Sequence, residues 1–200
     1  MQEAKNLKMY RQECDESLGN DYLRTALDKF AIAYKDSRSK AFADFDVEQL
    51  IDDIAQMKDD VLLNLEELYE QFKKKAEEGG VTVHYAKDAD EANKIIIDIA
   101  KENGCKRVAK SKSMTAEETL LNHALEDENM EVTETDLGEW IIQLRHEGPS
   151  HMVMPAIHLS RYQVKDLFTD VTGAQQEDDI EKLVKVARRE LRQKFVEADM

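Results

Sequence analysis

Arg107-Val-Ala-Lys-Ser-Lys-Ser-Met114 is a short apolar run that ends in a polar cluster and leads into a helix-like pattern. The same order recurs at residues 130–140 and 151–160. Alternating strands and helices are typical of an α/β domain with a parallel sheet, in which functional groups gather at the carboxyl ends of the strands. The sequence therefore predicts that three polar clusters lie along one rim of the sheet: Lys110–Ser113, Glu134–Glu139 and Pro155–His158.

Glycines and capping residues set the expected element boundaries in the second part of the chain. Asp88 can cap a helix that Gly104 ends, and Thr115 with Glu118 fits a capping box at the start of the next helix. The expected strands cover residues 81–84, 107–110, 130–134 and 150–155. The expected helices cover residues 89–103, 115–128 and 138–144, a segment after Ser160 that breaks at Thr172-Gly173, and a closing helix at about 179–198.

Residues 1–78 are predicted to be helical, because they contain no proline and Gly19 is their only glycine. After Asp46, apolar residues recur at steps of three and four, which predicts one helix of about thirty residues that ends at Gly79-Gly80. This apolar stripe comprises Val47, Leu50, Ile51, Ile54, Met57, Val61, Leu62, Leu65, Leu68, Tyr69 and Phe72. We therefore expect a helical extension at residues 1–78 and a second domain at 79–200. The stripe must pack on that domain, on a neighbouring helix or on a second chain.

Composition excludes several classes of protein. The net charge is −15 and no basic patch stands out, so nucleic acid is not an expected partner. No apolar run approaches the ~20 residues of a membrane span, and the first twenty residues carry no signal-peptide core. The two cysteines, Cys14 and Cys105, offer no disulfide framework or zinc spacing. These observations predict a cytoplasmic protein.

Lys110-Ser-Lys-Ser113 lies at a strand end just before a helix start. Free backbone N–H groups, hydroxyls and two ammonium groups would meet there, an arrangement that suits a phosphate or carboxylate. The segment lacks the glycines of a nucleotide-binding loop. The alternative interpretation is that Ser113 or Thr115 is only an N-cap and that the lysines are solvated.

Acidic residues and one histidine complete the predicted rim. Glu134, Asp136 and Glu139 follow the third strand and can bind a ribose hydroxyl, a cation or a basic partner. Capping is the favoured role of Asp136. His158 can act as an acid, a base or a ligand. A metal site is not expected, because no cysteine or second histidine lies at a useful spacing. The predicted ligand-binding set is Lys110, Lys112, Ser113, Glu134, Asp136, Glu139 and His158.

Five motifs together resemble the LUD domain of the lactate-utilization protein B family. They are Lys110-Ser-Lys-Ser-Met114, Leu121-Asn-His-Ala-Leu125, Glu134-Thr-Asp-Leu-Gly-Glu139, Ile141-Ile-Gln-Leu144 and Pro149-Ser-His-Met-Val-Met-Pro-Ala-Ile-His158. The resemblance implies a Rossmann-like fold of the glucosamine-6-phosphate deaminase, ribose-5-phosphate isomerase and CoA-transferase group. It also implies a bacterial or archaeal origin and a three-part cytoplasmic system that oxidises L-lactate to pyruvate.

The chain departs from the family in its length and its cysteines. The resemblance implies a continuation past Met200 that completes the LUD domain and adds a ferredoxin-like region with two [4Fe–4S] clusters. This chain is therefore expected to be a truncated portion that carries no cofactor of its own. A sheet cut short leaves an open edge, which together with the apolar stripe predicts a homodimer.

Three alternative functions are consistent with this sequence. The first is the LUD portion of an iron–sulfur electron-transfer subunit, which holds a small anion or another subunit of the lactate utilization complex and is not itself catalytic. The second is an enzyme of the phosphosugar isomerase or CoA-transferase type, with Glu134 or Glu139 as base and Lys112 as anion anchor. The third is a purely structural scaffold that docks through its long helix.

Overall fold

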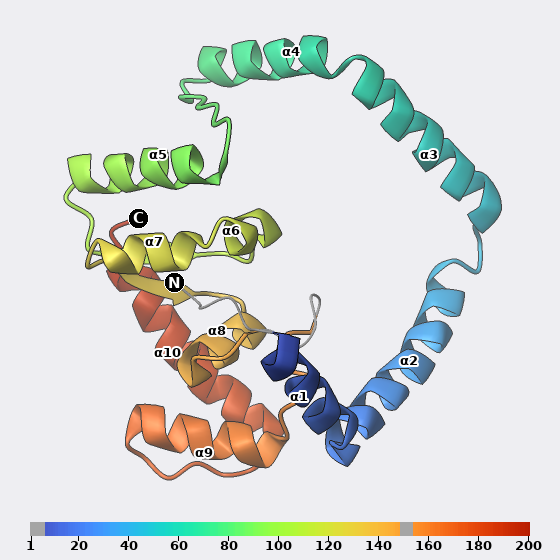
Figure 1. Cartoon of the computed structure of the whole chain (residues 1–200), viewed down its shortest axis with the longest axis vertical. Helices are drawn as coiled ribbons and strands as arrows, with labels where there is room; N and C mark the ends of the chain where they lie inside the picture. Colours follow the sequence, from blue (N-terminus) through green and yellow to red (C-terminus); the bar gives the residue numbers. More distant parts are fainter. Residues whose placement is uncertain (1–6, 149–153) are drawn as a thin grey trace. The chain divides into compact units, whose positions relative to one another are not determined.

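The computed structural model describes residues 7–148 and 154–200, which form ten helices and two strands (Figure 1). The chain divides into two compact units, one containing Asp28–Tyr85 and the other the residues up to Leu27 together with Ala86–Met200. The helices are α1 (Leu7–Leu18), α2 (Asp21–Ala41), α3 (Val47–Leu63), α4 (Leu65–Glu78), α5 (Ala89–Glu102), α6 (Met114–Glu118), α7 (Leu121–Asp127), α8 (Leu137–Arg145), α9 (Arg161–Thr172) and α10 (Ile180–Glu197).

The sheet consists of two parallel strands, β1 (Arg107–Lys110) and β2 (Glu131–Glu134). Arg107 pairs with Glu131 at one end, and Lys110 pairs with Glu134 at the other. The predicted α/β class is confirmed, and the two strands among the described residues are parallel as expected.

Two other predicted strands have a different outcome. The prediction for residues 81–84 is wrong, because residues 81–86 form no regular structure and Val81 is exposed without a neighbouring strand. The prediction for 150–155 falls mainly on residues 149–153, which lie outside the described residues. Pro155–His158 form a turn.

Both edges of the strand pair have hydrogen-bond partners. Along β1, the backbone N–H of Ala109 donates to the carbonyl of Met200 at 2.8 Å, and the N–H of Asp199 donates to the carbonyl of Arg107 at 2.8 Å. Along β2, the side-chain amide of Gln143 accepts from the N–H of Glu134 at 3.0 Å and donates to the carbonyl of Val132 at 2.8 Å. Gln143 therefore satisfies backbone groups that an edge strand leaves open.

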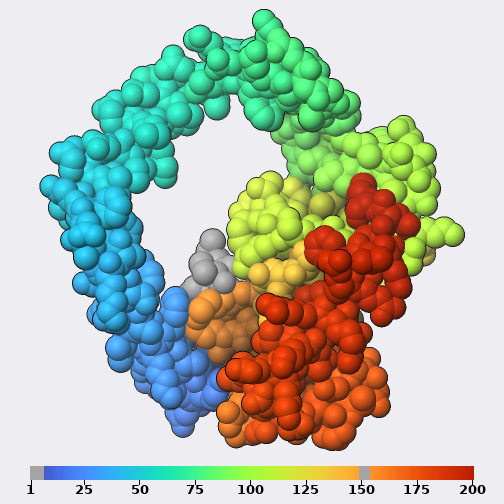
Figure 2. All heavy atoms as spheres, turned by 180° about the vertical axis from the view of Figure 1, so that it is seen from behind, coloured from blue at the N-terminus to red at the C-terminus, as the bar shows by residue number. Residues whose placement is uncertain are grey.

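The apolar core lies in two clusters. In the first, α5 and α7 cover the face of the sheet from which Val108 and Val132 project. The second joins α8, α9 and α10, where the rings of Trp140 and Phe168 lie 5.5 Å apart. Figure 2 shows the atoms of α9 and α10 (orange and red) packed against each other. Because α8 contacts β2 and α10 contacts β1, the second cluster holds the helices against the sheet.

Several predicted helix boundaries are confirmed, and two predicted helices are each divided in two. Asp88 caps α5, Gly104 ends it with φ +67°, and Asp179 caps α10. The single helix expected over 115–128 is instead two helices, α6 and α7. Leu120 separates them with φ +54°, a backbone conformation that is uncommon outside glycine.

The long helix expected after Asp46 is also two helices. The first helix, α3, begins after Asp46 as predicted, and Asp46 caps it, but this helix ends at Asn64, whose side-chain amide donates to the carbonyl of Asp60 at 2.8 Å. Such a local hydrogen bond competes with the helical pattern of the backbone. Neither α3 nor α4 contains a buried residue. Within the described residues, no helix is long and apolar enough to cross a membrane.

Candidate functional site

A buried ion pair lies at the carboxyl ends of β1 and β2. Lys110 ends β1 and Glu134 ends β2, so the parallel register places them side by side. The Nζ atom of Lys110 lies 2.6 Å from Oε1 of Glu134, and their side chains are 10% and 3% exposed. Burial of two charges is costly unless they are paired, so each of these side chains requires the other.

Helices α6 and α7 add further contacts to this pair. Glu117 of α6 lies 3.4 Å from Lys110, and the amide nitrogen of Asn122 in α7 donates to Oε1 of Glu134 at 2.7 Å. Two oxygen atoms here, Oε2 of Glu134 and Oδ1 of Asn122, are buried and have no hydrogen-bond partner within the described residues.

A second ion pair connects the segment after β1 to the start of α8. Lys112 lies 2.9 Å from Glu139, and the two side chains are 27% and 7% exposed. Asp136 caps the same helix, because its carboxylate accepts hydrogen bonds from the N–H groups of Gly138 and Glu139. The capping role favoured for Asp136 is therefore observed.

The two interpretations of Lys110-Ser-Lys-Ser113 each describe part of the structure. The hydroxyl of Ser113 accepts a hydrogen bond from the N–H of Ala116 at 3.2 Å and caps α6, so the capping alternative is observed for this residue. Thr115 and Glu118 both lie inside α6, so the capping box expected of them is wrong. The lysines are not solvated as that alternative expected, because each forms an ion pair with a buried carboxylate.

His158 lies near the carboxyl end of α8. Its Nε2 atom is 3.1 Å from the Glu147 carboxylate, which also accepts hydrogen bonds from the Arg145 guanidinium. Arg145, and to a smaller degree His158, lowers the pKa of Glu147 below its ordinary value, although burial opposes this. Asp136 and Glu139 lie at the opposite end of the helix.

Pro155 approaches the start of α8. A Cβ atom placed on Gly138 would lie only 2.8 Å from Cγ of Pro155, which explains why a glycine follows Asp136 and Leu137. The third predicted cluster therefore contacts α8 at both ends, Pro155 at its start and His158 beyond its end.

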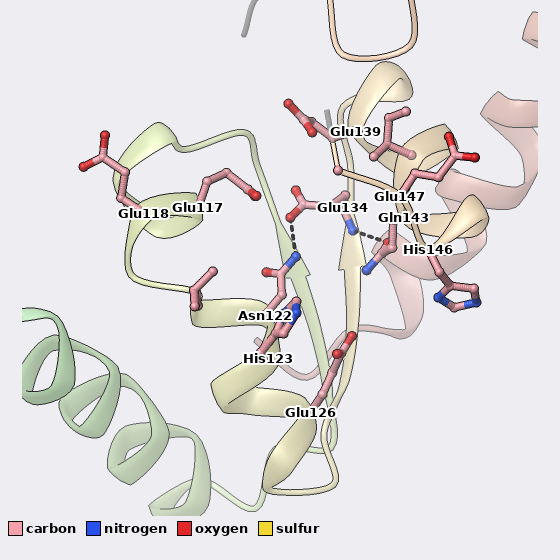
Figure 3. A pocket seen from close by; sticks show the side chains of 13 residues that line it. Glu117, Glu118, Asn122, His123, Glu126, Glu134, Glu139, Gln143, His146 and Glu147 are labelled. Atoms are coloured by element: carbon pink, nitrogen blue, oxygen red, sulfur yellow. Dashed lines mark hydrogen bonds between the residues drawn. The ribbon is translucent and has the colours of Figure 1, made fainter. Parts of the chain in front are cut away.

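A pocket of about 520 Å³ opens beside Glu134, between α6 and α7 on one side and α8 on the other (Figure 3). Glu134 and Glu139 belong to the predicted set, but the other polar lining residues do not. They are Glu117, Glu118, Asn122, His123, Glu126, Gln143, His146 and Glu147. Asn122 and Gln143 stand within motifs of the family resemblance, and that was the only signal in the sequence that marked them.

The described residues offer no preformed metal centre, because no group of three His, Cys, Asp or Glu side chains among them is arranged to hold an ion. A cubane iron–sulfur cluster takes about four cysteine thiolates. The chain has two cysteines, Cys14 half-exposed in α1 and Cys105 buried before β1. Its own residues therefore do not fit such a cluster.

Comparison with known proteins finds one domain family and relatives that share one name. The model of the LUD domain family matches residues 69–200. Lactate utilization protein B of Oceanobacillus iheyensis is 36% identical over 195 residues, which cover 96% of this chain and 40% of that protein. Lactate utilization protein B of Bacillus cereus is 41% identical over 145 residues, which cover 72% of this chain and 31% of that protein. The chain thus spans less than half the length of these relatives. No solved structure gives a significant match.

Proposed function

Because this chain belongs to the LUD domain family, we propose that it is the LUD-domain portion of an iron–sulfur electron-transfer subunit that serves the oxidation of L-lactate to pyruvate. The observation that carries this proposal is the similarity to lactate utilization protein B over 96% of the chain. Residues 79–200 form the N-terminal part of the LUD domain, and residues 1–78 form a helical extension. The protein acts in the cytoplasm.

The redox step in this proposal lies outside these 200 residues. The two cysteines do not fit a cluster, so the electron carriers belong to the two [4Fe–4S] clusters expected of the full-length family. The contribution of this chain is to bind, and the isolated chain is not catalytic.

The charged rim supports this binding role. Lys110, Lys112, Ser113, Glu134, Asp136 and Glu139 lie at the carboxyl end of the sheet and the start of α8, whereas His158 lies beyond the other end of α8. Asp136 is exposed and Lys112 is partly exposed, so charges of both signs reach the surface there and favour oriented docking of another protein, here another subunit of the lactate utilization complex.

Binding of a small anion at the charged rim is a more specific version of the same proposal. Lys112 is the lysine that reaches solvent, and its ammonium group is held by Glu139 at 2.9 Å. An entering carboxylate or phosphate must therefore take the place of Glu139 on Lys112. The exchange is possible because Lys112 is only partly buried, whereas Lys110 is enclosed by Glu134 and Glu117.

Growth on L-lactate tests the main proposal. In a strain that lacks lactate utilization protein B, a chimera of the Oceanobacillus iheyensis protein is expressed in which these 200 residues replace the aligned segment. We expect growth on L-lactate to be restored. A chimera that is folded and abundant but leaves growth at the level of the deletion strain would refute the proposal.

Titration tests the proposal that the charged rim binds a small anion. Lactate, pyruvate, phosphate and CoA are titrated into the wild-type chain and into Lys112→Ala. Loss of one charge-assisted hydrogen bond should weaken binding about tenfold or more. If an anion binds both proteins equally, the rim does not hold it. If none binds, the anion form is wrong and the growth test still decides the role in lactate oxidation.

Association with a second copy is a further part of the proposal. The apolar stripe on α3 and α4 is exposed at Met57, Leu62 and Phe72, which supports homodimer formation. Light scattering should give about twice the 23.0 kDa mass of one chain, and Leu62→Lys should reduce it toward that mass. A wild-type chain that remains monomeric at high concentration would contradict the dimer.

A further inference from the structure

The pocket beside Glu134 is strongly acidic. Six glutamates line it, Glu117, Glu118, Glu126, Glu134, Glu139 and Glu147, and no lysine or arginine does so among the described residues. Figure 3 shows these carboxylates arriving from both sides, from α6 and α7 on one and from β2, α8 and the residues after it on the other.

Cations outside the pocket neutralise only part of this charge. Lys110 pairs with Glu134 and Glu117, Lys112 with Glu139, and Arg145 with Glu147. Glu118 and Glu126 form no ion pair within the part of the chain that the structure describes. The space between the helices therefore keeps a negative potential, which favours a cation over an anion.

An unsatisfied buried acceptor is an independent sign of a ligand. Glu134 is almost fully buried, and it lines the pocket (Figure 3). Its Oε2 atom has no hydrogen-bond partner within the described residues, and neither has Oδ1 of the adjacent Asn122. Leaving a buried acceptor unpaired is unfavourable, and both of these atoms require a donor rather than another acceptor.

The other residues that line the pocket indicate which kind of hydrogen-bond donor the ligand carries. Ile142 is buried and Leu120 is half-exposed, and both face the pocket, so it has an apolar wall beside its carboxylates. A bare metal ion would make no use of that wall, and the described residues do not provide three ligands for one. An ammonium group carries one positive charge and three N–H donors, and an alkyl chain attached to it would lie on Leu120 and Ile142.

We propose that this pocket binds a primary alkylammonium group, with the charged nitrogen at Glu134 and Asn122 and the alkyl chain against Leu120 and Ile142. The two acceptor oxygens are covered, so binding in this way requires the Asn122 side chain to move. The group belongs to a free aliphatic amine or to a lysine side chain of another protein segment, because the same chemistry recognises both. The pocket shares Glu134 and Glu139 with the charged rim of the proposed function, but amine binding does not depend on the role in lactate oxidation.

Calorimetric titration of the whole chain at low salt tests the proposal. The probes are n-butylamine and 1,5-diaminopentane, with n-butanol and Mg²⁺ as controls for shape and for charge alone. N-acetyl-lysine amide represents the protein source. We expect the amines or the lysine derivative to bind and the two controls to bind at least about tenfold more weakly. The tighter of the two amine classes identifies the source.

Variants localise the binding. Glu134→Gln should weaken amine binding about tenfold or more, because it removes the buried charge. This variant disturbs the pair with Lys110, so the exposed residue Glu126 provides a milder change, and Glu126→Gln should weaken binding about twofold to fivefold. Glu102→Gln, an exposed change of the same charge at the end of α5, is the matched control and should leave binding unchanged.

Three results would overturn the inference. No binding of any amine is the first. The second is equal binding of n-butanol or Mg²⁺, which would mean that shape or charge alone accounts for the signal. The third is equal weakening in Glu102→Gln and Glu126→Gln, since the amine would then respond to the net charge of the chain and not to this pocket.

Discussion

Helices α10 and α3 carry the same kind of apolar stripe, yet only α10 buries part of it. Leu183 and Ala187 of α10 are enclosed by α8 and α9, whereas no residue of α3 is buried. Periodicity therefore indicates which face of a helix is apolar, but a neighbouring element has to cover that face before it contributes to stability. No residue of Asp28–Tyr85 is buried, whereas the buried residues of the other unit lie between Ala100 and Ala187.

Core truncation should give the largest difference between the two regions. Phe168→Ala removes a ring that is 1% exposed and packed on Trp140, so the free energy of unfolding should fall by about 3–5 kcal/mol. Phe72→Ala removes a ring that is 63% exposed on α4, so its cost should stay below about 0.5 kcal/mol. Urea unfolding followed by circular dichroism measures both, and similar losses would show that the stripe on α4 is covered in solution.

The second largest difference between the two regions should come from the stability cost of breaking an ion pair. Glu134→Ala leaves Lys110 buried without its closest partner and should cost about 3 kcal/mol. Asp36→Ala breaks the exposed pair between Asp36 and Lys40 in α2, whose side chains are 65% and 76% exposed, and should cost at most about 0.5 kcal/mol. The double change Lys110→Met with Glu134→Leu should recover much of the loss, because no buried charge is then left unpaired. A Glu134→Ala protein as stable as wild type would contradict the buried pair.

Removal of a helix cap should cost the same stability in the two regions. Asp136 caps α8 and Asp46 caps α3, each through a carboxylate that accepts backbone N–H groups of the first turn. Because a cap acts within its own helix, Asp136→Ala and Asp46→Ala should each cost about 1 kcal/mol. Thermal unfolding with asparagine replacements as conservative controls measures this. A cap effect confined to α8 would mean that α3 forms only when something packs on it.

The smallest expected effect is the loss of the Glu147 contribution to stability at acid pH. The pKa of Glu147 is lowered by Arg145 first and by His158 next, so this carboxylate stabilises the fold at neutral pH. The contribution is present above the ordinary range of a carboxyl group and is lost as the pH falls through the lowered pKa. Since the pair is about one-third exposed, the loss should stay below about 1 kcal/mol. Unfolding measured at pH 7 and pH 3 should differ less in Glu147→Gln than in wild type, and identical differences would rule out this pair.

The candidate site was predictable in part. The parallel rule placed Lys110 beside Glu134, because strands that start on one side of a sheet end together. The sequence did not indicate that each lysine would lie against a buried carboxylate, since Lys110 and Glu134 are 24 residues apart and Lys112 and Glu139 are 27 apart. Asn122, Gln143 and the acidic pocket were missed for the same reason, because they are defined by neighbours in space.

The sequence by itself determined local features: the caps Asp88, Asp136 and Ser160 and the helix end at Gly104. These depend on hydrogen bonds within a few residues, so their signals are local in the sequence. Only the tertiary structure decided that residues 81–84 are not a strand, that Gln143 covers the edge of β2, and that the apolar faces of α8, α9 and α10 meet. Strand pairing, burial and charge neutralisation all require a partner from elsewhere in the chain, and the position of that partner is fixed only when the chain folds.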